Sequence, residues 1–208
     1  MNSTESRTVQ RSTTSRQNVA RRPLSGSAND REGARLFALG MLCTGGWLAS
    51  VLVGYTVDCG PELHRFGLAV HILALVLSFG AILVVDWLGL LWLLGKVEMH
   101  ASGKLEAAAK PLIWGGLALL LASGALIDPD LTNPATAVKL ACVLVLMING
   151  LSIAPAMHRL LASPPRTRFG ELTRALRLRL MVALSISQAC WWTAVLIGLI
   201  NSTLRRWA

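Results

Sequence analysis

The chain has 208 residues, of which 53% are hydrophobic and only 15% are charged, and its mean hydropathy is +0.54. This composition excludes an ordinary water-soluble domain, in which about a quarter of the residues are charged. The formal net charge of +9 does not indicate nucleic-acid binding, because no aromatic residues interleave with the basic ones as stacking platforms. The apolar residues form runs of about 20, the length that a bilayer-spanning helix needs.

Residues 1–29 are rich in Ser, Thr and Arg and contain almost nothing that could be buried, which predicts a disordered basic tail. The first span is predicted over residues 36–54, as an uncleaved signal anchor. Within it, Gly46, Ser50 and Gly54 recur at every fourth position. Such a stripe of small residues predicts a face on which another helix can approach closely.

Four more spans follow, over residues 66–95, 111–127, 135–157 and 180–201. The first of these is longer than a bilayer requires and is followed by polar residues, so we expect its end to project into water. Asn133 and Pro134 predict a capped helix start at the fourth span, which would make the third and fourth spans a hairpin. Before the fifth span, Arg174, Arg177 and Arg179 alternate with leucines and predict an interfacial stretch whose guanidinium groups reach lipid phosphates.

The sequence therefore predicts an all-α fold, a polytopic bundle of about five transmembrane helices over residues 30–208. Lys and Arg are concentrated in the tail, around Lys96 to Lys110 and between Arg159 and Arg179. These segments share one side of a five-span protein, so the positive-inside rule places the N-terminus in the cytoplasm. Anionic lipid at the cytoplasmic face is the expected partner. The uncleaved anchor and the lack of a persuasive transit peptide favour a bacterial plasma (inner) membrane.

Asp86 is a carboxyl group inside the second span, where its charge costs a few kcal/mol unless it is neutral, paired or next to a polar cavity. Counted from the predicted cytoplasmic ends, four other polar residues lie at about the same depth, namely Thr44, Asn149, Ser187 and Gln188. We therefore expect an intramembrane polar layer around Asp86. Two interpretations stay open, because the layer could lock helix packing or Asp86 could bind or relay a proton or cation.

His71 and Lys139 lie near the outer ends of the second and fourth spans, at similar predicted depth. A histidine at this depth is a candidate proton site or haem ligand. No other histidine is placed to be the second axial ligand within one chain. Haem would therefore need Met or Lys, or His71 from a second copy. An interfacial histidine without a special role is the simpler interpretation.

The sequence contains no HExxH metal motif, no GxSxG nucleophile elbow and no Gly-rich phosphate loop, so it names no catalytic or metal site. Its four cysteines are far apart and form no CxxC pair, and those in spans are expected to fill space. Two hypotheses follow: proton-coupled transport of a small solute or ion, and a non-transporting membrane-complex or assembly subunit. The second includes a haem-binding redox subunit through His71, and both allow a homo-oligomer.

Overall fold

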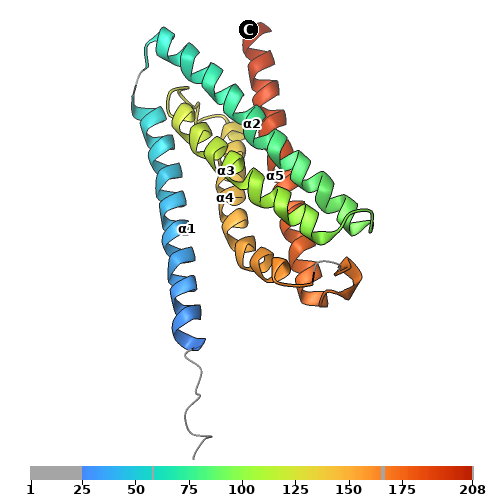
Figure 1. The fold of residues 1–208 in the computed structure, drawn as a ribbon. Coiled ribbons are helices and arrows are strands. Elements are labelled where there is room, and N and C mark those ends of the chain that lie inside the picture. Colours follow the sequence, from blue (N-terminus) through green and yellow to red (C-terminus); the bar gives the residue numbers. More distant parts are fainter. Residues whose placement is uncertain (1–24, 58, 165–166, 208) are drawn as a thin grey trace, which may run out of the picture. The chain divides into compact units, whose positions relative to one another are not determined.

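A computed structural model describes residues 25–57, 59–164 and 167–207 (Figure 1). In these ranges the chain forms α-helices, one 3-10 turn and no strand. The elements are α1 (Ser25–Thr56), α2 (Pro61–Leu93), α3 (Met99–Gly124), α4 (Pro134–Leu161), η1 (Phe169–Glu171) and α5 (Arg174–Trp207). Residues 1–37 and 38–208 are separate units, and the packing below is that of residues 38–208.

All five described α-helices contain a stretch long and apolar enough to cross a membrane, which confirms the predicted helical, multi-span architecture. Large apolar side chains on them are exposed, including Leu42 (71%), Leu73 (66%) and Val76 (65%). A water-soluble protein would bury such groups, whereas acyl chains solvate them in a bilayer. The predicted tail lies outside the described residues up to position 24, and residues 25–29 belong to α1.

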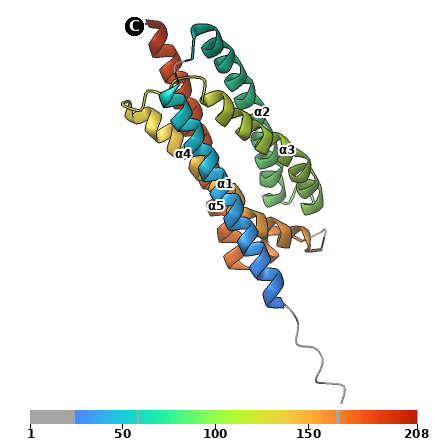
Figure 2. The same cartoon turned by 90° about the vertical axis from the view of Figure 1, so that its left-hand side faces the viewer.

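The α2 and α3 helices cross closely because small residues meet at their contact (Figure 2). Ala74 and Ser78 on α2 are fully buried, and Gly116 faces them from α3. The Ser78 hydroxyl donates a hydrogen bond of 3.1 Å to the carbonyl oxygen of Ile113. A Cβ atom at position 116 would lie 2.6 Å from the Ser78 Cβ, so the two backbones are already as close as they can be.

The third and fourth spans follow one another through a short turn, as the hairpin prediction states, but they are not each other's main packing partners. The α3 helix packs along α2, and α4 packs along α5, whereas α3 and α4 touch only briefly. In a bilayer no hydrophobic effect drives apolar helix faces together, because lipid tails are equally apolar. Helices therefore pair where small residues let their backbones approach closely. The two pairs meet in one core that contains Ala74, Leu117, Leu120, Leu146, Met147 and Trp191.

The turn between α2 and α3 also differs from the prediction. A backbone hydrogen bond of 2.9 Å from Lys96 to Leu91 and a positive φ of 71° at Gly95 end α2 in a Schellman motif. The helix therefore ends at Leu93, before the polar residues Lys96 and Glu98. The α3 helix then begins at Met99 rather than at Pro111, which lies inside it. Alanine-rich sequence before Pro111 has high helix propensity, which explains the earlier start.

One further local prediction is confirmed, and another is confirmed in part. Asn133 caps α4, because its side-chain oxygen accepts a hydrogen bond of 2.9 Å from the Ala135 amide. In the small-residue stripe of α1, the Ser50 hydroxyl donates to the Leu121 carbonyl at 2.6 Å. An added Cβ at Gly54 would lie 2.9 Å from the Pro129 ring, whereas one at Gly46 would meet nothing within 4 Å. Two of the three stripe residues thus make the close approach.

Arg179 has a different partner from the lipid phosphate that the sequence predicts. Its guanidinium group donates a hydrogen bond of 2.5 Å to the carbonyl oxygen of Ser152 on α4. Pro155 lies inside α4 one turn later, where its ring lacks an N–H and disturbs the carbonyls of the preceding turn. Arg179 therefore links α5 to a backbone carbonyl at the proline site of α4, a common way to satisfy such groups in membranes.

Candidate functional site

Asp86 forms a hydrogen bond across the bundle, from α2 to α5. The Gln188 side-chain nitrogen donates to the Asp86 carboxyl oxygen. The Gln188 amide oxygen in turn accepts a hydrogen bond of 3.1 Å from the Trp192 indole nitrogen. Trp192 thus fixes which end of the amide faces Asp86, since an indole N–H can only donate. Gln188 and Trp192 together orient the Asp86 carboxyl group, which lies next to a cavity.

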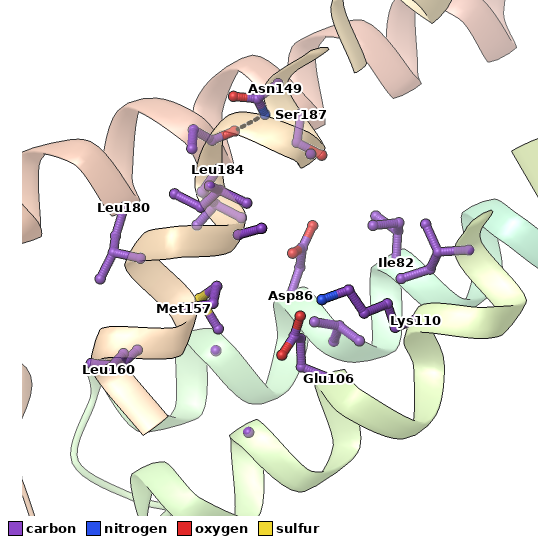
Figure 3. A pocket seen from close by; sticks show the side chains of 18 of the residues that line it. Ile82, Asp86, Glu106, Lys110, Asn149, Met157, Leu160, Leu180, Leu184 and Ser187 are labelled. Carbon is purple, nitrogen blue, oxygen red and sulfur yellow. Dashed lines mark hydrogen bonds between the residues drawn. The ribbon is translucent and has the colours of Figure 1, made fainter. Parts of the chain in front are cut away.

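The cavity has a volume of about 280 Å³ and is lined by residues of α2, α3, α4, α5 and η1. Its wall is largely apolar, and five polar side chains interrupt it: Asp86, Glu106, Lys110, Asn149 and Ser187. Figure 3 shows Asp86, Glu106 and Lys110 directed toward one another from α2 and α3. Few, convergent polar groups in an apolar hollow are typical of a small-molecule site.

The structure brings four residues of the predicted polar layer together and leaves one out. The cavity is lined by Asp86, Asn149 and Ser187. Gln188 does not line it but donates a hydrogen bond to Asp86. Asn149 also holds two helices together, because its side-chain nitrogen donates at 2.8 Å to the Ala183 carbonyl oxygen on α5 (Figure 3). Thr44 does not line the cavity, to which α1 contributes no residue. Counting depth along single helices could not reveal this, because depth carries no information on which face of α1 meets the bundle.

Glu106 and Lys110 are the site residues that sequence analysis missed. It placed Lys110 in a cytoplasmic loop and gave Glu106 no role, whereas both belong to α3 and line the cavity. A usable signal was present, since Glu106-Ala-Ala-Ala-Lys110 combines good helix formers with an oppositely charged pair spaced i, i+4. That pattern indicates a helix one turn or more longer than the apolar run alone.

His71 lies outside this cavity, at the α2–α3 contact. Its Nδ1 atom is 3.0 Å from the Ser123 hydroxyl oxygen, and that hydroxyl donates at 2.6 Å to the Leu119 carbonyl. Which of the two groups donates in the His71–Ser123 hydrogen bond depends on the imidazole tautomer. Lys139 on α4 is within electrostatic range of the His71 ring. This geometry gives His71 a place in helix packing, and its ligation of haem stays a prediction.

Two of the cysteines that sequence analysis treated as separate fillers lie together. The thiols of Cys142 on α4 and Cys190 on α5 are close enough to interact with each other. We expect copper–phenanthroline oxidation of the membrane-embedded protein to join them as an intramolecular disulfide. The measurement is the loss of one pair of maleimide-reactive thiols after denaturation, reversible by dithiothreitol.

The matched control for this oxidation is Cys43→Ser, which leaves the pair intact and keeps the disulfide. Cys142→Ser or Cys190→Ser is expected to abolish it. If both thiols of the pair stay reactive after oxidation in the folded protein, the proximity of Cys142 to Cys190 is wrong.

The sequence matches no protein-family model, and searches of the curated proteins and of the solved structures give no match either.

Proposed function

We propose that this chain is a membrane transporter for a small solute, coupled to proton movement, and that Asp86 is the group that takes up and releases the proton. The observation that carries the proposal is the Asp86 carboxyl group beside a cavity of about 280 Å³ within the helical bundle. A charged carboxyl group inside a membrane span costs free energy unless its surroundings stabilise the charge. A change in those surroundings therefore changes whether Asp86 holds a proton.

The helix pairs supply a way to couple the proton to the cavity. Asp86 belongs to the α2–α3 pair, and Gln188 belongs to the α4–α5 pair. An ionised carboxylate accepts a stronger hydrogen bond than a neutral acid does. Protonation of Asp86 therefore weakens one link between the pairs, and the pairs enclose the cavity. A ligand that prefers one ionisation state of Asp86 shifts the same equilibrium.

The proposal includes the orientation and the membrane. The N-terminus lies in the cytoplasm of a bacterium, with the chain in the plasma (inner) membrane, because Lys and Arg cluster before α1, around α3's start and between α4 and α5. The basic segment around Arg159, Arg168 and Arg174 then faces the anionic lipid of the cytoplasmic leaflet.

Infrared difference spectroscopy tests the proton site directly. The full chain is reconstituted in lipid and titrated from acid to alkaline pH, and the carboxylic acid C=O stretch is followed. Among the bands of the chain's carboxylic acids, we expect one that is absent in Asp86→Asn and that disappears as the pH rises. The Glu106 carboxyl group and the Lys110 ammonium group face Asp86 from α3, so Glu106→Gln identifies any second band.

The functional readout is proton movement in proteoliposomes that contain a pH dye. Small polar and amphiphilic solutes from a cell extract are added outside, and we expect a solute-dependent pH change that Asp86→Asn abolishes. If Asp86 shows no exchangeable proton and none of the added solutes causes proton movement, the transport proposal is wrong. The chain would then be the non-transporting membrane subunit that the sequence also allows.

A further inference from the structure

The formal charges of the residues that line the cavity do not sum to zero. Asp86, Glu106 and Lys110 are the charged residues among those that line it within the described chain. With all three ionised, the cavity holds two carboxylates and one ammonium group, and therefore one negative charge in excess. Glu106 and Lys110 are one helical turn apart, whereas Asp86 comes from another helix. Whichever carboxylate Lys110 faces, the other is left without a cationic partner in the cavity.

The other groups around Asp86 do not supply the missing charge. Gln188 donates a neutral amide N–H to Asp86, and Asn149 uses its side-chain nitrogen on the Ala183 carbonyl. An unpaired carboxylate in an apolar surrounding is unfavourable, so the cavity favours an occupant that carries one positive charge. A proton on Asp86 provides that charge when the cavity holds no ligand.

The walls indicate what kind of cation fits. Aromatic rings of Trp92, Trp114, Trp191 and Phe169 line the cavity, and most of the remaining wall is aliphatic. Indole rings attract organic cations to their faces, and aliphatic walls favour an apolar body. A bare metal ion needs several oxygen ligands, whereas the described residues contain no group of three or more His, Cys, Asp and Glu side chains that could hold one.

From the charge and the walls together, we infer that the cavity binds a monovalent organic cation with an apolar body, its cationic end beside Asp86 and Glu106. This inference rests on the proposed function and names its substrate class. Binding of the cation replaces the proton on Asp86, so one proton is released to solvent for each cation bound and the charge in the cavity stays constant.

The test uses benzyltrimethylammonium as the probe, with the full chain in lipid nanodiscs. Its neutral carbon isostere neopentylbenzene has the same shape without the charge, benzenesulfonate carries the opposite charge, and phenylalanine is zwitterionic. We expect saturable binding of the cation alone, with quenching of tryptophan fluorescence and proton release in weak buffer. Asp86→Asn should weaken binding at least about tenfold, the effect of losing one charge-assisted contact.

Two further variants keep the result interpretable. Glu106→Gln also removes a cavity carboxylate, and a weaker affinity in that variant supports the inference even if Asp86→Asn does not fold. Glu62→Gln removes a carboxylate that lies outside the cavity, exposed and paired with Arg65 at 3.2 Å, and should leave binding unchanged.

Several outcomes would overturn the inference. These are equal binding of neopentylbenzene, saturable binding of benzenesulfonate, and phenylalanine binding that depends on Lys110. The infrared band of Asp86, measured on the same samples, separates the two proposals. If that band titrates while no cation binds, the substrate class is wrong and the proton site stands. If the band is absent and no cation binds, both proposals fail.

Discussion

Gly116→Ala is expected to destabilise the protein by about 2 kcal/mol, the typical cost of forcing a group into a well-packed contact. The new Cβ would lie 2.6 Å from the Ser78 Cβ, 3.1 Å from the Ser78 Cα and 3.2 Å from the Ala74 carbonyl oxygen. Two of these neighbours are backbone atoms, so no side-chain rotation relieves the clash and α2 must move away from α3. The measurement is the free energy of unfolding in an SDS titration of detergent-solubilised protein.

The matched control is the same substitution at the next residue. Gly115 is exposed, and a Cβ there would meet nothing within 4 Å. Alanine has a higher helix propensity than glycine, by up to about 1 kcal/mol, so Gly115→Ala should be neutral or stabilising. Equal stability losses at positions 115 and 116 would contradict the α2–α3 crossing, and with it the position of Asp86 relative to Glu106.

Asp86→Asn is expected to fold with nearly unchanged stability and to lose all proton coupling. An asparagine oxygen at this position still accepts the hydrogen bond from Gln188, whose orientation Trp192 maintains. The amide cannot ionise, so solute-dependent proton movement in proteoliposomes should vanish. The free energy of unfolding measured in SDS should stay within about 1 kcal/mol of that of the unmodified chain, which is the usual net contribution of one neutral hydrogen bond.

Asp86→Leu separates the functional from the structural role. Leucine is favourable in lipid but leaves the Gln188 N–H without its acceptor, which costs about 1–3 kcal/mol when the group is buried. We expect this variant to be both less stable than Asp86→Asn and inactive. Full stability and full activity of Asp86→Leu would contradict the proton role and the polar contact together. Loss of stability with retained activity in Asp86→Asn would indicate that the layer only locks helix packing.

Much of the fold is predictable from the sequence, because the decisive properties belong to single segments. A run of about 20 apolar residues specifies a membrane-spanning helix whichever other helices it packs against. The Asn133 cap and the Pro134 helix start are likewise local. The site was predictable only in part. The presence of Asp86 in a span drew attention to it, and matching depth identified Asn149, Ser187 and Gln188 but also selected Thr44, which does not line the cavity.

The sequence by itself thus determined that the chain is helical, where its apolar helices lie and that a carboxyl group stands inside one of them. Only the tertiary structure decided that α2 pairs with α3 and α4 with α5, that Glu106 and Lys110 join Asp86 at one cavity, and that Cys142 contacts Cys190. The physical reason is that lipid solvates every apolar face alike. Helix partners are therefore selected by the close fit of small residues such as Gly116 and by a few polar contacts between helices, and neither is visible in the hydropathy of one segment.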